Sequence, residues 1–175
     1  FGLARITAAW LQVGQELGDE KISELLRSDN AEVAFQLALH YLDYRPRAEA
    51  EVRRRLHEHH IPDEVADPVI ERLRNSGLID DARFAKEWVE NRSTFRPRSI
   101  RALTVEMRQR GVPGEVIQNA VTDVDEDTLA LQAARKQARK LQDLEWQDFR
   151  RKLSSFLARR GFRYATIAPV VTQTW

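Results

Sequence analysis

The sequence repeats itself with a period of about 50 residues, and this repeat limits the fold more than any other feature. Tyr44–Arg47 (YRPR) returns 51 residues later as Phe95–Arg98 (FRPR), and the turn Arg110–Val112 (RGV) returns 50 residues later as Arg160–Phe162 (RGF). The apolar positions expected in the core shift in step: Val52, Leu103 and Leu153; Leu56, Met107 and Leu157; Ala66, Ile117 and Ile167; Val69, Ala120 and Val170. Three copies of one unit that share contacts with their neighbours explain this pattern.

Each unit is predicted to contain three helices, because its apolar residues recur every three to four positions and alternation typical of strands is absent. The first helices are expected at about 31–44, 81–93 and 126–142, and the second at about 47–59, 98–109 and 147–159. The third helices begin near Asp63, Gly114 and Tyr164. The predicted fold is therefore all-α, with three tandem three-helix repeats forming an elongated, curved body.

Glycine and proline mark where these helices end and begin. Gly111 and Gly161 stand where a left-handed residue would close the second helix, because glycine adopts positive φ without a Cβ clash. His60 holds the equivalent place in the first unit and fits it less well. Pro68 and Pro169 share a register, and we expect both close to the first turn of the third helix, where a missing N–H costs little.

Acidic residues are the predicted start signals of the first helices. Asp80 and Asp125 are expected N-caps of the second and third units. Asp29 and Glu32 are expected to form a capping box that begins the first unit's opening helix. The polar segment Thr122–Asp127 is the best hinge candidate between repeats.

The domains follow from these boundaries. Residues 31–79, 80–124 and 125–175 are assigned to the three repeats, and residues 1–30 to an N-terminal extension. Within the extension, Asp19–Ser28 is expected to form a short helix, while Phe1–Gln15 could be helix or strand. Residues 1–29 and 30–79 each carry a net charge of −2, residues 80–124 carry +1 and residues 125–175 carry +4. The C-terminal repeat is therefore the expected site of contact with an anionic partner.

Composition and motifs exclude most catalytic chemistry. The chain contains no cysteine, which rules out thiolate catalysis and zinc–thiolate sites, and no run of about 18 apolar residues could span a membrane. GxGxxG, GxxxxGK[ST] and GxSxG motifs do not occur. His57–His60 is not HExxH, and helix capping explains the pair Asp80-Asp81 without catalysis. We expect a cytoplasmic protein that is not an enzyme and has no cofactor and no bound metal.

Basic residues concentrate on the second helix of each unit and are the candidate binding residues. They are Arg53, Arg54, Arg98, Arg101, Arg108, Arg110, Arg150, Arg151, Lys152, Arg159 and Arg160. The planar guanidinium fork binds carboxylate and phosphate, so arginines at equivalent positions could line one face. The alternative is a solvated helix surface with internal pairs, because Glu49, Glu51 and Glu58 lie nearby. Trp88 and Trp146 fit helical apolar stripes or turns and are assigned to packing.

Four segments resemble a known family. Gly77–Ala85 (GLIDDARFA) is similar to the most distinctive motif of the RecX family, and Ala38–Arg47 resembles that family's opening signature. The turns Arg110–Val112 and Arg159–Phe162 match its later glycine-centred turns, and the resemblance covers about residues 30–173. The motif positions with an expected structural role are Gly77, Leu78, Asp80, Asp81, Phe84, Ala85, Gly111, Gly161 and Phe162. His59-His60 departs from the family's usual Lys/Arg-Gly pair, so contacts there are expected to differ.

The resemblance implies a regulator that docks along the groove of the RecA–single-stranded DNA filament. Such docking inhibits ATP hydrolysis, strand exchange and the stimulation of repressor cleavage by RecA. The implied partners are RecA and, weakly or through RecA, single-stranded DNA, with no membrane and with the chain as a monomer. A helix-turn-helix-like protein that binds DNA directly is the alternative, although a net charge of +1 argues against it.

Overall fold

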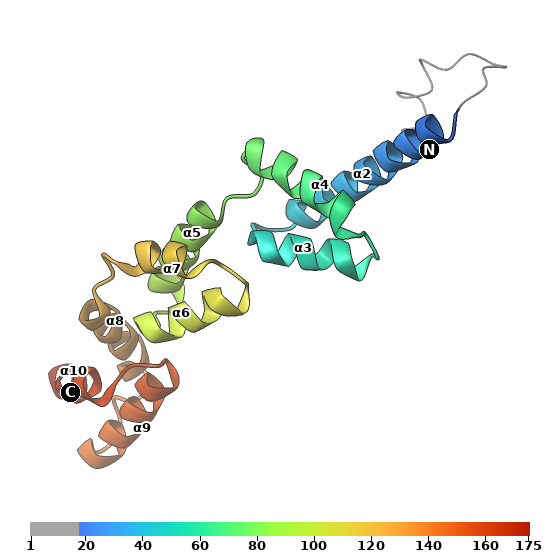
Figure 1. The fold of residues 1–175 in the computed structure, drawn as a ribbon. Helices are drawn as coiled ribbons and strands as arrows, with labels where there is room; N and C mark the ends of the chain where they lie inside the picture. The colour runs from blue at the N-terminus through green and yellow to red at the C-terminus, as the bar shows by residue number, and fades with distance from the viewer. Residues whose placement is uncertain (1–17) are drawn as a thin grey trace. The chain divides into compact units, whose positions relative to one another are not determined.

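The computed structural model describes residues 18–175, with side chains from Asp29 onward (Figure 1). Within this range every regular element is a helix, which confirms the all-α prediction and its three tandem three-helix repeats. The helices are α2 (Asp19–Asp43), α3 (Glu49–Glu58), α4 (Asp63–Asn75), α5 (Asp81–Phe95), α6 (Ile100–Gln109), α7 (Gly114–Val121), α8 (Glu126–Ala138), α9 (Trp146–Arg159) and α10 (Tyr164–Thr174). The ambiguous segment Phe1–Gln15 lies outside the described residues.

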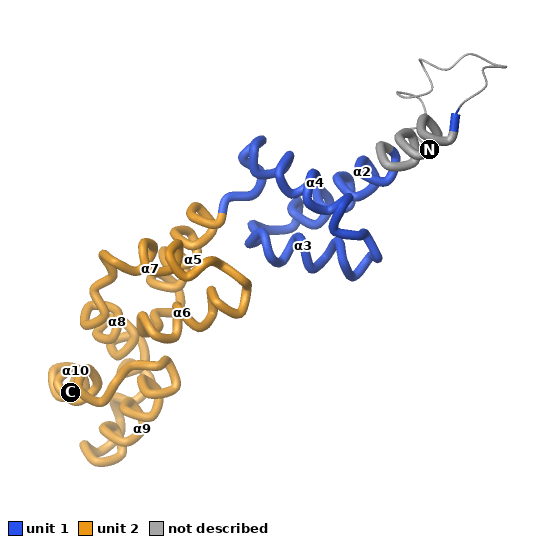
Figure 2. The backbone as a smooth tube through the Cα atoms, viewed as in Figure 1, with its two compact units in different colours: residues 1–80 blue, residues 81–175 orange. Residues whose placement is uncertain are grey.

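The chain divides into two compact units, which Figure 2 shows in different colours. Unit 1 ends at Asp80 and contains α2, α3 and α4, which form the first repeat. Unit 2 runs from Asp81 to Trp175 and contains the second repeat (α5, α6, α7) together with the third (α8, α9, α10). Repeats 2 and 3 therefore share one body.

Each repeat has its own apolar core, built from the faces that the periodicity predicts. Of the predicted core positions only Ala120 is partly exposed, and the others are buried. Val52 and Leu56 of α3 pack with Leu73 of α4 in repeat 1, and Leu153 and Leu157 of α9 form the centre of repeat 3. Burying a leucine side chain contributes about 2 kcal/mol, so these positions determine which face of each helix turns inward.

The second helix of every repeat ends in the same hydrogen-bonded turn. The backbone N–H of Ile61 donates to the carbonyl oxygen of Leu56 at 3.1 Å, and Val112 and Phe162 make the equivalent bonds to Met107 and Leu157. This six-residue closure requires positive φ at the residue before the donor. Accordingly φ is +82° at Gly111, +91° at Gly161 and +60° at His60, which confirms that the histidine occupies a left-handed position.

Two local predictions, the short helix Asp19–Ser28 and the capping box after it, are wrong. The helix α2 continues from Asp19 to Asp43, so no capping box at Asp29 and Glu32 begins a new helix. No glycine or proline interrupts residues 19–43, and Ser, Asp and Asn cost less than about 0.7 kcal/mol each in a helix interior. Pro68 and Pro169 are each the sixth residue of their helices, just after the first turn and close to where the sequence places them. The residues four positions earlier are exposed, so water can bond the carbonyls that these prolines leave free.

Two of the predicted helix starts agree with the structure. The Asp125 carboxylate accepts hydrogen bonds from the backbone N–H groups of Asp127 and Thr128, both at 3.1 Å, and so caps α8. Asp80 immediately precedes α5, in the position expected for an N-cap. Among the described helices, none is long and apolar enough to cross a membrane.

Candidate functional site

The turn between α5 and α6 lies against the end of α9, which joins repeat 2 to repeat 3. The backbone N–H of Ser99 donates to the carbonyl oxygen of Arg160 at 3.1 Å, and the Arg160 guanidinium donates to the carbonyl oxygen of Pro97 at 3.1 Å. Pro97 and Ser99 are fully buried. A Cβ at Gly161 would lie 2.5 Å from the Ser99 hydroxyl, so this packing requires glycine as well as positive φ.

Two further contacts hold the repeats together and overturn the predicted hinge at Thr122–Asp127. A Glu126 carboxylate oxygen accepts from the Ile100 N–H at 2.9 Å, at the N-terminus of α6 where the helix dipole favours a negative charge. The Lys136 ammonium donates to the carbonyl oxygen of Thr94 at 2.7 Å. The polar joint lies inside unit 2 and is tied to repeat 2, so the prediction of a hinge there is wrong.

Three arginines lie within electrostatic range of Arg160 at this junction, and we call the four the guanidinium cluster: Arg92, Arg96, Arg98 and Arg160. Burial lowers the pKa of the Arg160 guanidinium, and the positive charges of the other three members lower it further. Glu106 is the carboxylate that faces the cluster, with ion pairs of 2.9 Å to both Arg92 and Arg98. Arg96 and Arg160 have no carboxylate partner among the described residues, so the cluster keeps an excess of positive charge.

Trp88 is a packing residue, as the sequence predicts, and it organises the neighbouring arginines. Its indole N–H donates to a Glu106 carboxylate oxygen at 2.9 Å, and its ring stacks on Phe84. The Arg110 guanidinium lies 3.9 Å from the Trp88 ring centroid, and Arg160, at the equivalent position of repeat 3, lies over a different aromatic ring. Packing on aromatic rings therefore explains why arginine recurs at these two positions.

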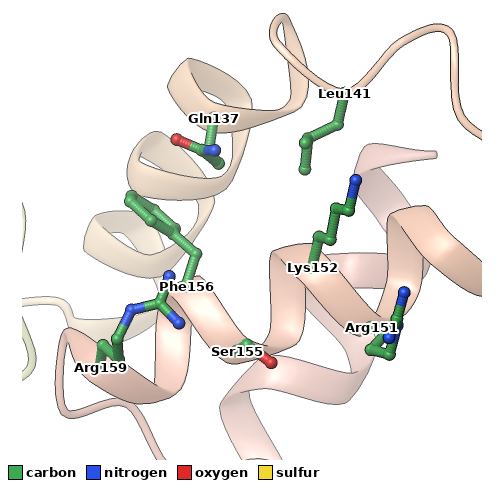
Figure 3. Close-up of a pocket in the computed structure, with 7 residues that line it drawn as sticks. All are labelled: Gln137, Leu141, Arg151, Lys152, Ser155, Phe156 and Arg159. Carbon is green, nitrogen blue, oxygen red and sulfur yellow. The ribbon is translucent and has the colours of Figure 1, made fainter.

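A cavity of about 420 Å³ opens between α8 and α9 in repeat 3. Figure 3 shows its lining: Gln137, Leu141, Arg151, Lys152, Ser155, Phe156 and Arg159. Lys152, Phe156 and Arg159 are spaced at i, i+4 and i+7, so they project from one face of α9. The Phe156 ring also carries Arg160 on it, with the guanidinium 4.8 Å from the ring centroid. The cavity is thus continuous, through Phe156, with the guanidinium cluster.

The lining of this cavity is cationic, and two of its three cations have no compensating carboxylate. It contains no carboxylate, and within the described part of the chain Lys152 and Arg159 make no ion pair. Arg151 pairs with Asp148 at 2.7 Å. Charge also separates the two units: unit 2 has 18 basic and 12 acidic residues, a net charge of +6, whereas residues 1–80 have 10 and 15, a net charge of −5.

Two arginines of α3, Arg53 and Arg55, are neutralised within unit 1. Arg53 pairs with Glu49 at 3.8 Å and also contacts Asp67, whose hydrogen bond raises the pKa of the guanidinium. Arg55 pairs with Glu58 at 3.0 Å. These pairs are the internal contacts that the alternative interpretation of the basic residues expects.

The structure thus divides the candidate binding residues into two groups. Six of these candidates are exposed and have no ion-pair partner among the described residues: Arg54, Arg101, Arg108, Arg150, Lys152 and Arg159. Internal contacts occupy the others: Arg53, Arg98, Arg110, Arg151 and Arg160. The histidine segment gives no ligand set, because His57 pairs with Asp63 and no group of three metal-ligating residues gathers in the described region.

The family-motif residues lie at helix ends or among the buried residues of the repeats. Gly77 has φ of +69° and follows α4, where it closes the helix before Leu78. Phe84 and Ala85 are buried on α5, which begins at Asp81. Phe162 is buried in the core of repeat 3.

Sequence reasoning missed the residues that give the cavity its shape and the junction its charge. Gln137, Leu141, Ser155 and Phe156 line the cavity, and Arg92 and Arg96 belong to the guanidinium cluster. The spacing of Phe156 between Lys152 and Arg159 was a detectable signal, because an aromatic residue among cations on one helical face is typical of single-strand binding.

Comparison with known proteins settles which family has this arrangement. Models of the first, second and third three-helix domains of RecX match residues 34–73, 80–121 and 125–171. The chain belongs to the RecX family. Among its relatives, the regulatory protein RecX of Mycolicibacterium vanbaalenii is 38% identical over 150 residues, which cover 81% of this chain and 82% of the relative. Regulatory protein RecX of Mycobacterium avium is also 38% identical, over 80% of this chain and 83% of the relative.

Solved RecX structures have the same fold. The crystal structure of RecX from Lactobacillus salivarius aligns with a TM-score of 0.71 at 19% identity, and covers 84% of this chain and 97% of that one. A second crystal structure, of a regulatory protein RecX, aligns with a TM-score of 0.74 at 24% identity, and covers 94% of this chain and 83% of that one. At these identities the likeness concerns the RecX fold alone.

Proposed function

We propose that this protein binds the RecA–single-stranded DNA filament and inhibits its ATPase, strand-exchange and coprotease activities. The observation that carries the proposal is the match of all three RecX domains across residues 34–171, together with relatives named regulatory protein RecX. Because RecA filaments form on chromosomal DNA, we expect the protein to act in the cytoplasm. We also expect it to act as a monomer, without catalysis and without a cofactor.

The distribution of charge supports a polyanionic filament as the partner. Unit 2 carries a net charge of +6, and its candidate cations without an ion pair lie on α6 and α9. Complementary charge speeds encounter and fixes register more than it raises affinity. We therefore propose that Arg101, Arg108 and Arg150 make filament contacts, whereas internally paired residues such as Arg53 stabilise the fold.

Co-sedimentation with preassembled RecA–single-stranded DNA filaments tests this function. The variant carries Glu at Arg101, Arg108, Arg150 and Arg151, and circular dichroism checks that it remains helical. We expect its apparent affinity to fall at least tenfold, because three proposed attractive contacts become repulsive and a fourth cation beside them is also reversed. Equal sedimentation of a folded variant and the wild type would contradict the proposed surface.

Direct binding to duplex DNA without RecA is the competing function, and the charge of unit 2 is the observation that favours it. It predicts strong retention on duplex DNA alone, with affinity falling steeply as salt rises. The filament proposal instead predicts that RecA raises the affinity for DNA well above that for bare duplex. The same sedimentation assay with and without RecA separates the two.

A further inference from the structure

We propose that the cavity between α8 and α9 is a binding site for a nucleotide unit of single-stranded DNA, with Lys152 and Arg159 on its phosphates and Phe156 against its base. This inference rests on the proposed function and deepens it, because it states which component of the filament occupies repeat 3. At about 420 Å³ the cavity is within the usual size range of small-molecule sites.

The charges of the cavity call for an anion. Lys152 and Arg159 are separated by about 10 Å along the axis of α9, and neither has an ion-pair partner among the described residues. Arg151 adds a third positive group to the lining, although Asp148 partly neutralises it. Like charges around one cavity repel each other, and a bound phosphate diester would relieve that repulsion.

The uncharged part of the lining favours a nucleotide over a simple carboxylate. Phe156 and Leu141 give the cavity an apolar wall, on which a base could stack. In the region that the structure describes, the amide of Gln137 and the hydroxyl of Ser155 make no hydrogen bond within the protein. Both can therefore form a hydrogen bond with a base edge or a sugar. An acidic side chain of a protein would use the cations and leave this wall without a partner.

Continuity with the guanidinium cluster favours a strand over a free mononucleotide. Arg160 lies on the Phe156 ring, and it is also within electrostatic range of Arg92, Arg96 and Arg98. A chain that leaves the cavity past Phe156 therefore meets further positive charge for its next phosphates. Backbone tracking by cations, combined with an aromatic platform, is the usual chemistry of single-strand binding.

The site belongs to repeat 3 alone. In the 50–51-residue register, Lys152 corresponds to Glu51 in repeat 1 and Ala102 in repeat 2. Arg159 corresponds to Glu58 and Gln109 in the same way. The repeat scaffold therefore permits acidic or neutral residues at these positions, and their cationic character in repeat 3 is not required by the fold.

The test is fluorescence anisotropy of a labelled oligothymidylate, titrated with the full chain at several salt concentrations without RecA. The variants are Lys152→Gln, Arg159→Gln and Phe156→Leu, which retains the apolar contacts of Phe156 but removes its π face. Lys86→Gln is the matched control, because Lys86 is an exposed cation of the same unit that lies outside the cavity.

We expect each charge variant to weaken binding about fivefold or more and to reduce the salt slope by about 0.7, the value for one lost phosphate contact on a single strand. Phe156→Leu should weaken binding by a similar factor with the slope unchanged, since stacking releases no counterions. Lys86→Gln should bind as the wild type does. A mononucleotide should compete far less effectively than the strand.

Oligothymidylate affinities that are equal in all variants would overturn the cavity proposal, and so would full competition by polyglutamate, which would identify an acidic protein surface as the occupant. Inhibition of RecA ATPase, measured in the same preparations, separates this result from the proposed function. If the wild type inhibits RecA ATPase but the cavity variants bind oligothymidylate as the wild type does, only the cavity proposal is contradicted. Strand binding in the cavity without inhibition by the wild type would contradict the proposed function only.

Discussion

The backbone N–H of Ser99 donates to the carbonyl oxygen of Arg160 across the boundary between repeats 2 and 3, at 3.1 Å. Both residues belong to helix-end turns that recur along the chain, so the junction uses features that each repeat already has. Ser99 is fully buried, and its hydroxyl accepts from the Ala102 N–H at 3.1 Å to cap α6. One residue thus begins a helix and joins two repeats.

Gly161→Ala should destabilise unit 2 by about 3 kcal/mol or more. The new Cβ would lie 2.5 Å from the Ser99 hydroxyl and 2.9 Å from the Ala102 Cβ, at a φ of +91°. Gly77→Ala is the matched control: φ is +69° there and no atom lies within 4 Å, so the cost should be about 1 kcal/mol. Urea denaturation followed by circular dichroism measures both, and equal costs would show that the junction is loosely packed.

His60→Gly should stabilise unit 1 by about 0.5 kcal/mol or more. His60 adopts φ of +60°, and relief of its Cβ clash outweighs the extra chain entropy of glycine. His59→Gly is the opposite control, because His59 has φ of −94°, which histidine adopts without strain. A urea midpoint that rises for His60→Gly and falls for His59→Gly agrees with this account, and a fall in both contradicts it.

Glu106→Gln should lower the free energy of unfolding by about 2 kcal/mol, because the Glu106 carboxylate joins the Trp88 indole to Arg92 and Arg98. The neutral amide leaves these two cations facing Arg160 without compensation. Glu58→Gln removes an exposed pair with Arg55 and should cost less than about 0.5 kcal/mol. Thermal unfolding followed by tryptophan fluorescence measures both losses of stability. Equal losses for the two substitutions would contradict a structural role of the Glu106 carboxylate.

Stability should fall as pH is lowered below about 4.5. Hydrogen bonds from Gln36 and then Arg72 hold the pKa of Glu32 below its usual 4.5, and bonds from Thr128 hold the pKa of Asp125 below its usual 3.8. Groups with a lowered folded-state pKa stabilise the fold above their unfolded pKa and lose that contribution as they protonate. Glu32→Gln should flatten the pH dependence of unit 1 and Asp125→Asn that of unit 2. Urea midpoints between about pH 6 and pH 3 measure this, and unchanged profiles would exclude these groups as the cause.

The residues explain why part of this structure was predictable. Leu103, Met107 and their counterparts repeat at helical spacing, and Gly111 and Gly161 mark turns that only a residue without Cβ adopts freely. Local signals of this kind act within one helix and its end. They located the helices of each repeat and the interior face of each.

Contacts between repeats have no such signal. Nothing in the sequence around Ser99 indicates that its N–H reaches the carbonyl of Arg160, because that bond depends on how two repeats dock. The continuation of α2 past Asp29 escaped prediction for another reason: Ser, Asp and Asn are typical of helix caps, but they cost little enough in a helix interior for the helix to run through them. The cavity needs α8 as well as α9, so the basic residues of α9 alone could not reveal it.

The most direct measurement is RecA ATPase activity on single-stranded DNA, with this protein titrated in at moderate salt. The account predicts inhibition at amounts well below one molecule per RecA protomer, because a regulator that docks along a filament affects more subunits than it contacts. It also predicts that the variant with Glu at Arg101, Arg108, Arg150 and Arg151 requires at least tenfold more protein for the same effect. Undiminished ATP hydrolysis by a cognate RecA, with the folded wild-type protein in excess, would contradict the proposed function.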